Sequence, residues 1–343
     1  IIGIATKFFT CTLSVMYREK TKDGEIFGGP MYVIKNGLPK RMLPLAYFFA
    51  LAGMIGCLPA FQSNQLIQIT GDLAFSGIEN FNIFGGLVLA GITGIVVIGG
   101  LKRIAGVATF LVPLMGSIYF GAMLIALTLN LDQVFPAFKL ILVDAFNGTA
   151  IAGGTFFGVL IYGVRRGAFS NEAGMGTESL VHGVAKVSDP VKQGLVAMTG
   201  PIFDTLIICT ATALMILISG VWETSTSQGV TLTAEAFSML LGNFGGFILF
   251  ICVICFGLST IFTYSYYGAS CSRFLFGKFG MKFYIYLYIL SIFIYSIVPI
   301  DIAINIADGA FAMMAIPTLV SALWLAPKVM QASKNYFKLI DSY

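Results

Sequence analysis

The stretch "GVRRGAFSNEAGMG", residues 163–176, differs sharply from the apolar sequence on either side of it. It places two arginines and a glutamate among four glycines, whereas charged residues make up only 10% of the 343-residue chain and hydrophobic residues 57%. This composition, with a mean hydropathy of +0.90, lies far outside the range of water-soluble domains. The sequence therefore predicts a membrane protein, in which this stretch is a catalytic loop, a folding device or part of a path through the membrane.

Apolar windows of about 20 residues, the length that a helix needs to cross a bilayer, recur along the whole chain. We expect an all-α polytopic membrane protein, with one transmembrane domain over residues 1–343. The second span is long enough to be strongly tilted, and the fifth is short and interrupted by glycines. The nine predicted spans are residues 1–16, 42–75, 82–100, 104–130, 150–164, 198–220, 243–272, 283–298 and 302–327.

The basic residues test this map, because Lys and Arg accumulate in cytoplasmic loops. All of the 20 Lys and Arg residues except Lys7 and Lys139 fall into groups on alternate loops. The pattern predicts a multi-pass protein of the cell (inner) membrane, with its C-terminus in the cytoplasm and residues 163–176 at the cytoplasmic end of the fifth span. Because the positive charges are dispersed and form no stripe, we expect a lipid bilayer and no nucleic acid as the partner.

Catalytic and metal-binding patterns are missing from the sequence. The pair Cys252 and Cys255 has a C-x-x-C spacing but no second ligand pair, and His182 is the only histidine. The chain contains no H-E-x-x-H, G-x-S-x-G or P-loop motif. We therefore expect neither an enzyme nor a metal centre.

Glycines and buried polar residues mark three of the predicted spans. Gly153, Gly154 and Gly158 open the fifth span, where they either let backbone groups face a cavity or let two helices pack closely. The polar run of the second span either contacts a ligand or forms hydrogen bonds between helices. This run, in "CLPAFQSNQLIQIT" (57–70), comprises Gln62, Ser63, Asn64, Gln65 and Gln68.

In the seventh span, "FGLSTIFTYSYYG" (256–268) places Ser259 and Thr260 side by side. Their hydroxyls suit a dehydrated monovalent cation, or they bond back to a carbonyl one turn earlier. Isolated charges in or beside spans are costly, so pairing is expected for Glu172, which has Arg165 and Arg166 within reach.

The stretch that opens this section belongs to a longer signature. Residues 162–217, "YGVRRGAFSNEAGMGTESLVHGVAKVSDPVKQGLVAMTGPIFDTLIICTATALMIL", closely resemble the central signature of the alanine or glycine:cation symporter family, the sodium:alanine symporters of bacteria and archaea. The resemblance extends over essentially the whole chain. Flanking matches in the expected order are "GIATKF" (3–8), "GGPMYVI" (28–34), "GGLKRI" (99–104), "LTAEAF" (232–237), "FGLSTIFTYSYYG" (256–268) and "MAIPTL" (314–319).

The resemblance implies a leucine-transporter-like fold of two inverted five-helix repeats, and sodium-coupled symport of a small neutral amino acid such as alanine or glycine by alternating access. The sodium ion is the coupling ion, and no other cofactor is expected. By position, it assigns Gln62, Asn64, Gly153 and Gly154 to the substrate and Ser259 and Thr260 to sodium.

The proposed pocket and the chemistry of nearby side chains suggest roles for several further residues. Tyr264 is expected to form a wall of the substrate pocket. Arg165, Arg166, Asn171 and Glu172 are expected to act in gating, with Ser170 or Asn171 as the N-cap of the turn that follows.

The sequence departs from the family pattern at several points. Family members begin with two spans, whereas this sequence starts inside the second, so we expect the N-terminal spans to be missing from it. Thr10 stands where the family has glutamate, Tyr264 where it usually has tryptophan, and Phe311 where it has asparagine. The alternative to a symporter is a non-transporting membrane scaffold or a degenerate paralogue.

Overall fold

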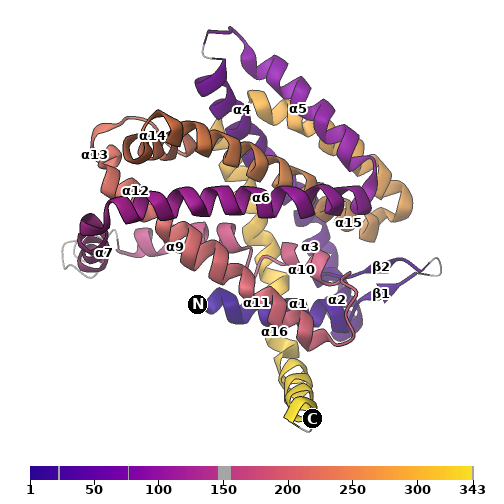
Figure 1. Ribbon diagram of the computed structural model, residues 1–343. Helices are drawn as coiled ribbons and strands as arrows, with labels where there is room; N and C mark the ends of the chain where they lie inside the picture. The colour runs from indigo at the N-terminus through magenta and orange to yellow at the C-terminus, as the bar shows by residue number, and fades with distance from the viewer. Residues whose placement is uncertain (22–23, 76, 146–155, 342–343) are drawn as a thin grey trace.

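The chain folds almost entirely into helices in the computed structural model, which describes all residues except 22–23, 76, 146–155 and 342–343. Within these limits the only strands are β1 (Glu19–Lys20) and β2 (Ile26–Phe27), which form a small antiparallel hairpin (Figure 1). The helices are α1 (Ile2–Met16), α2 (Pro30–Gly37), η1 (Lys40–Met42), α3 (Leu43–Gly56), α4 (Ala60–Ala74), α5 (Phe81–Val97), α6 (Gly100–Leu129), α7 (Leu131–Ala145), α9 (Phe156–Asn171), α10 (Thr177–His182), α11 (Pro190–Pro201), η2 (Ile202–Cys209), α12 (Thr210–Ser219), α13 (Val221–Thr224), α14 (Val230–Leu241), α15 (Asn243–Ile297) and α16 (Ile300–Asp341).

The described helices include several that can cross a bilayer. Five helical stretches are long and apolar enough, and three shorter apolar helices accompany them. The prediction of an all-α, multi-pass membrane protein is therefore confirmed. The long stretches are Lys40–Ala74, Gly100–Leu129, Pro190–Ser219, Phe244–Ile297 and Ile300–Ile340, and the shorter helices are Ile2–Met16, Phe81–Val97 and Val230–Leu241.

The second predicted span is not one tilted helix. It consists of α3 and α4, with a break at residues 57–59. Pro59 has no backbone N–H to donate to the preceding turn, and Ala60 N bonds the nearby Leu58 O instead. The polar run of this segment therefore begins a separate helix, α4, whose direction α3 does not fix.

Gly277 divides α15 into two helical halves. Its φ of 68° lies in the left-handed region, which glycine adopts without the steric cost that a side chain brings. The predicted spans 243–272 and 283–298 correspond to these halves. Helices α2, α7, α10, α13 and α14 lie outside the predicted spans and were missed, as was most of α11.

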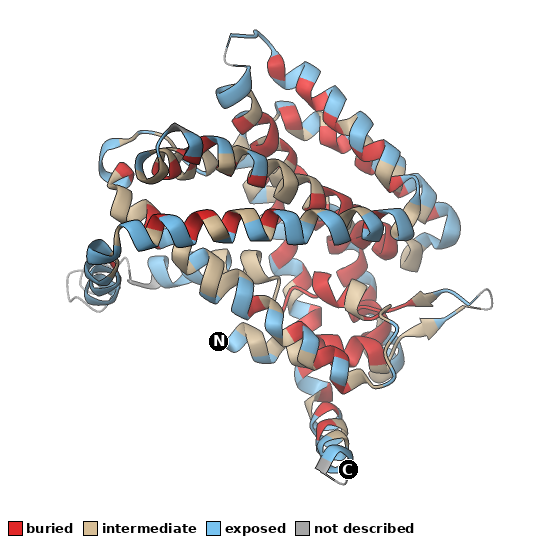
Figure 2. Cartoon of the chain, in the orientation of Figure 1, coloured by how far each residue is buried: buried red, intermediate tan, exposed pale blue. Residues whose placement is uncertain are grey.

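Large apolar side chains are exposed over much of the surface, and α5, α6 and α15 carry exposed segments, pale blue in Figure 2. Phe84 is 66% exposed, Ile95 69% and Phe110 69%. In water such a surface would aggregate, but it suits helices that face hydrocarbon. The main core lies among α2, α3 and α15, where Phe49, Met31, Tyr284 and Tyr288 are fully buried.

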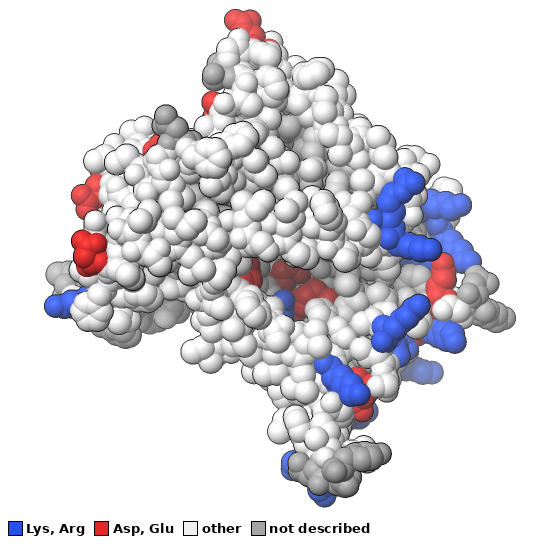
Figure 3. Space-filling view, in the orientation of Figure 1, with Lys and Arg blue, Asp and Glu red and all other residues white. Residues whose placement is uncertain are grey.

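Charged residues are separated on the face shown in Figure 3. Lys and Arg gather on the side of the β1–β2 hairpin, whereas Asp and Glu dominate at the top and at the end near α13. A hollow below α6 also holds acidic side chains and a basic one. The charge separation agrees with the alternation of basic loops in the sequence.

Candidate functional site

A cavity of about 510 Å³ lies between α4, α6, α12, α14 and α15, with the end of α9 and the π-helix η2 on one side. Ligand sites for small molecules have volumes of this order. No Lys or Arg lines it in the described part of the chain. Its polar lining residues are Gln62, Gln65, Tyr119, Ser170, Glu172, Asp204, Thr212, Thr233, Thr260 and Tyr264. We call it the central cavity.

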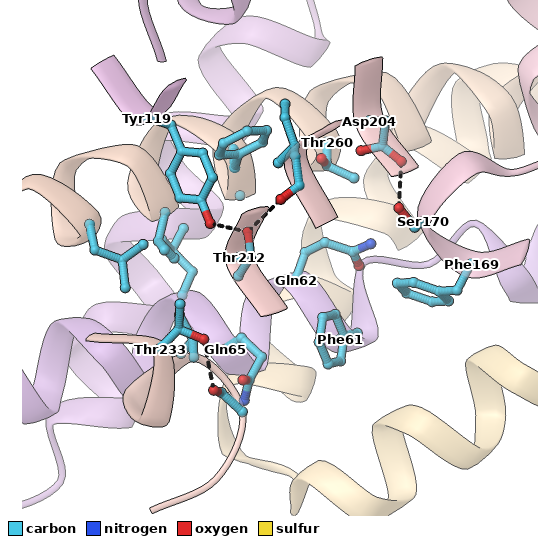
Figure 4. Close-up of a pocket in the computed structure, with 18 of the residues that line it drawn as sticks. Phe61, Gln62, Gln65, Tyr119, Phe169, Ser170, Asp204, Thr212, Thr233 and Thr260 are labelled. Carbon is cyan, nitrogen blue, oxygen red and sulfur yellow. Dashed lines mark hydrogen bonds between the residues drawn. The ribbon is translucent and has the colours of Figure 1, made fainter. Parts of the chain in front are cut away.

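Helix α4 provides two amides to the central cavity, because Gln62 and Gln65 are three residues apart and share a face. The Gln65 amide Nε2 donates to Gln68 Oε1 at 2.8 Å. In Figure 4, Gln62 groups with Thr260, Ser170 and Asp204, whereas Gln65 lies in another part of the cavity. Gln62 is thus close to the residues that the other helices contribute.

Asn64 lies on a different face of α4 and does not line the central cavity. Its Nδ2 donates to Val298 O at 2.7 Å and to Tyr295 O at 3.4 Å. These carbonyls belong to the last turn of α15 and the residue after it, where no further helical N–H is available. The observed role of Asn64 is therefore to hold two helices together, which is the structural alternative that the sequence left open.

Helix α15 brings Thr260 and Tyr264 to the central cavity, one turn apart. Ser259 is rotated by about 100° from Thr260 and lies outside the cavity lining. Its Oγ donates to Phe256 O at 3.0 Å. The predicted sodium pair is therefore split: Thr260 faces the cavity, and Ser259 bonds back to its own helix.

Asp204 is a lining residue whose importance the sequence interpretation missed. It lies in η2, which begins directly after Pro201 at the end of α11. The Ser170 hydroxyl donates to Asp204 Oδ2 (Figure 4). π-helical turns occur often at functional sites, because the wider turn redirects side chains. An acidic residue inside a predicted span was the available signal.

Glu172 lies at the corner between α9 and α10. Its φ of 56° is left-handed, which is uncommon for a residue with a side chain and ends α9 here. The Thr177 hydroxyl donates to Glu172 Oε2 at 2.7 Å, and Tyr264 lies beside the carboxylate. The Thr318 hydroxyl of α16 donates to Met175 O at 3.3 Å, which anchors the corner.

The expected pairing of Glu172 with the arginines is wrong. Arg166 instead binds Asp308 of α16, with 2.5 Å between Nη2 and Oδ2. Because α9 continues to Asn171, Arg166 points toward α16 while Glu172 turns into the cavity. Arg165 and Asp308 both line a neighbouring cavity of about 400 Å³.

The expected N-cap is also wrong. Ser170 and Asn171 belong to the last turn of α9, and the residue before α10 is Gly176. Asn171 Oδ1 accepts from Ala173 N at 3.0 Å, so its side chain closes the turn that ends α9. The predicted substrate residues Gly153 and Gly154 lie outside the described residues.

A smaller chamber of about 260 Å³ adjoins the central cavity and shares Ser170, Glu172 and Asp204 with it. It adds Lys7 from α1 and Glu178 from α10. The Thr10 hydroxyl donates to Glu178 Oε1 at 3.0 Å, whereas Glu178 Oε2 is buried without a partner in the described structure. This loss of hydration raises the pKa of Glu178 to about 7.

Comparisons with known proteins identify the family of the chain. The model of the sodium:alanine symporter family matches residues 1–342. The transporter YflA of Bacillus subtilis is 36% identical, with 98% of this chain and 72% of YflA covered. The sodium/alanine symporter AgcS of Methanococcus maripaludis is 35% identical over 97% of this chain and 74% of its own length. The amino-acid carrier protein AlsT of Bacillus subtilis is 32% identical, with 98% of this chain and 71% of AlsT covered. The chain is a transmembrane protein that belongs to the sodium:alanine symporter family, a family of transporters.

Proposed function

We propose that the protein is a sodium-coupled symporter of small neutral amino acids in the cell membrane, with alternating access to the central cavity. One observation carries the proposal: the central cavity joins two amides, several hydroxyls and two carboxylates from separate segments of a transporter-family chain. On this proposal the fold is the leucine-transporter-like inverted repeat, with nine spans in this chain and a cytoplasmic C-terminus.

The cavity lining suits a zwitterion. The carboxylates of Asp204 and Glu172 attract an α-ammonium group, and Gln62 offers an amide to either end of the substrate. Tyr264 forms one wall and limits the size of the side chain, which favours alanine or glycine. Gly153 and Gly154 remain substrate contacts by family position alone.

For the coupling ion, we propose that Thr260 provides an oxygen ligand from the cavity side. Ser259 contributes only if its hydroxyl leaves Phe256 O, to which it donates at 3.0 Å. Sodium prefers several oxygen ligands at once, so carbonyl groups from another segment complete the site.

The proposed gate is the corner between α9 and α10. The Arg166 to Asp308 pair joins α9 to α16, while Glu172 and Asn171 fix the turn. Arg165 lines the same neighbouring cavity as Asp308, and we assign it to the gate as well. Opening the gate toward one side of the membrane requires these contacts to separate.

Uptake of radiolabelled alanine into proteoliposomes tests the proposal. The protein, expressed with any sequence that precedes Ile1 in its reading frame, is expected to give saturable uptake with an inward sodium gradient and little with potassium. If uptake is no higher than in empty liposomes for alanine, glycine and glutamine, the scaffold alternative replaces the symporter.

A further inference from the structure

A basic cavity of about 400 Å³ lies away from the transport site, and the two share no lining residue. It is enclosed by the β1–β2 hairpin, α2, the start of α3 and the bend of α15 at Gly277. Its charged lining residues are Glu19, Lys20, Lys35, Arg273 and Lys278. Four cations thus face one carboxylate, and the cavity attracts anions.

Two of these cations, Arg273 and Lys35, form ion pairs with neighbouring carboxylates. Arg273 has a side chain only 11% exposed, and its guanidinium lies 3.8 Å from the centre of the Phe27 ring. It donates to Glu25 Oε2 at 2.8 Å, and Lys35 Nζ lies 2.8 Å from Glu19 Oε1. Lys20, Lys35 and Arg273 together outnumber the two carboxylates, Glu19 and Glu25, that pair with the last two.

The remaining wall is aromatic and borders an apolar surface. Tyr32 and Tyr47 both pack against Phe274, at 5.4 and 5.7 Å between ring centres. Next along α15, Phe276 is 60% exposed and Phe279 81%. Aromatic rings beside Lys and Arg are typical of the boundary between headgroups and acyl chains.

We propose that this cavity binds the phosphate headgroup of an anionic phospholipid. Lys20, Lys35 and Arg273 face the phosphate, and the exposed rings on either side of Gly277 lie along the acyl chains. A soluble phosphate compound would bind to the same cations, but it would leave the exposed rings of Phe276 and Phe279 without an apolar contact. The cavity also lies on the basic side of the protein in Figure 3, the side that faces the anionic cytoplasmic leaflet by the positive-inside rule.

Titration of the purified protein with phosphatidylglycerol and with phosphatidylcholine tests the proposal by native mass spectrometry. The wild type is expected to retain phosphatidylglycerol preferentially. The double variant Lys20→Gln, Lys35→Gln is expected to bind it about 30-fold more weakly, since each basic residue near an anionic surface contributes about fivefold. The control Lys334→Gln, Lys338→Gln removes the same charge from the exposed end of α16 and is expected to bind like the wild type.

Equal retention of both lipids by the wild type would overturn the proposal, as would equal weakening in the two double variants. A third outcome that contradicts it is full displacement of the lipid by millimolar inorganic phosphate, which would indicate a site for a soluble anion. Equal melting temperatures of wild type and variants in phosphatidylcholine alone establish that the variants fold.

Discussion

The central cavity and the basic cavity hold their charged groups by opposite means. In the central cavity, hydroxyls of Ser170 and Thr177 donate to the carboxylates of Asp204 and Glu172. In the basic cavity, full counter-charges hold Lys35 and Arg273. A hydroxyl fixes a carboxylate without neutralising it, so the charges of the central cavity stay available to a ligand. Ion pairs at the surface contribute little to the free energy of unfolding, and here they mainly hold the two side chains in place.

The largest expected effect concerns Glu178, whose carboxylate accepts a hydrogen bond from one hydroxyl, that of Thr10, among the described residues. Its pKa rises from 4.5 to about 7 because it is buried. The folded state therefore binds the proton more tightly than the unfolded state, and this stabilisation is complete below about pH 4.5 and is lost as the pH rises through 7. We expect Glu178→Gln to be more stable than the wild type at pH 8 by about 3 kcal/mol, and equally stable at pH 4.5.

Melting temperatures of detergent-solubilised protein between pH 4.5 and 8 measure this effect. Glu223→Gln, at an exposed position of α13, is the matched control and keeps the wild-type profile. A variant at Glu178 that loses stability with pH as steeply as the wild type contradicts the prediction.

The second prediction tests whether the carboxylate of Asp204 acts on the substrate. Asp204→Asn keeps the shape and removes the charge, so we expect alanine uptake at low substrate concentration to fall about 10- to 100-fold, as for the loss of a hydrogen bond to a charged group. The control Asp301→Asn, at the exposed start of α16, is expected to transport normally. Normal uptake by Asp204→Asn, at equal protein level, would mean that the charge serves only Ser170.

The third prediction separates the two hydroxyls of α15. Thr260 lines the central cavity, whereas Ser259 donates to Phe256 O. We expect Thr260→Ala to raise the sodium concentration for half-maximal uptake about tenfold, and Ser259→Ala to change it less than about twofold. Thr260→Val is a second variant, which removes the hydroxyl and keeps the size of the side chain. Equal effects of the two alanine variants would show that both hydroxyls bind the ion.

The smallest effects are expected in the basic cavity. The Lys35 and Glu19 side chains are 45% and 34% exposed, so Lys35→Met should change the free energy of unfolding by less than about 1 kcal/mol. Arg273→Met is expected to cost more, because the arginine also packs on Phe27. Thermal unfolding without anionic lipid compares the two variants. A larger loss of stability for Lys35→Met than for Arg273→Met would contradict this prediction.

The helical fold was predictable from the sequence because crossing a bilayer requires long apolar windows. The break between α3 and α4 was less visible, since a proline within an apolar stretch either kinks a helix or ends it. The helix α7 was missed because Asp132 and Lys139 lower its hydropathy. Length and composition reveal a spanning helix, but they do not reveal a shorter helix with charges.

The candidate site could be predicted only in part. Spacing places Gln62 and Gln65 on one face of α4, but it does not show that this face meets the cavity while Asn64 meets α15. The ion-pair partners of the charged residues were harder to predict than the cavity face. The residue at which α9 ends determines the directions of the Arg166 and Glu172 side chains. Arg166 was therefore expected near Glu172, although Asp308, more than a hundred residues later, is its partner.

The apolar outer surface determines how the folded state is stabilised. Because rings such as Phe84 and Phe110 remain exposed in the folded protein, separating its helices within a bilayer transfers them from lipid to lipid, not from lipid to water. The heat-capacity change and the denaturant sensitivity of such unfolding are therefore small for a chain of this length. Close packing and the internal hydrogen bonds provide most of the stability, so single polar contacts such as that of Asn64 have a larger share in it than in a soluble protein.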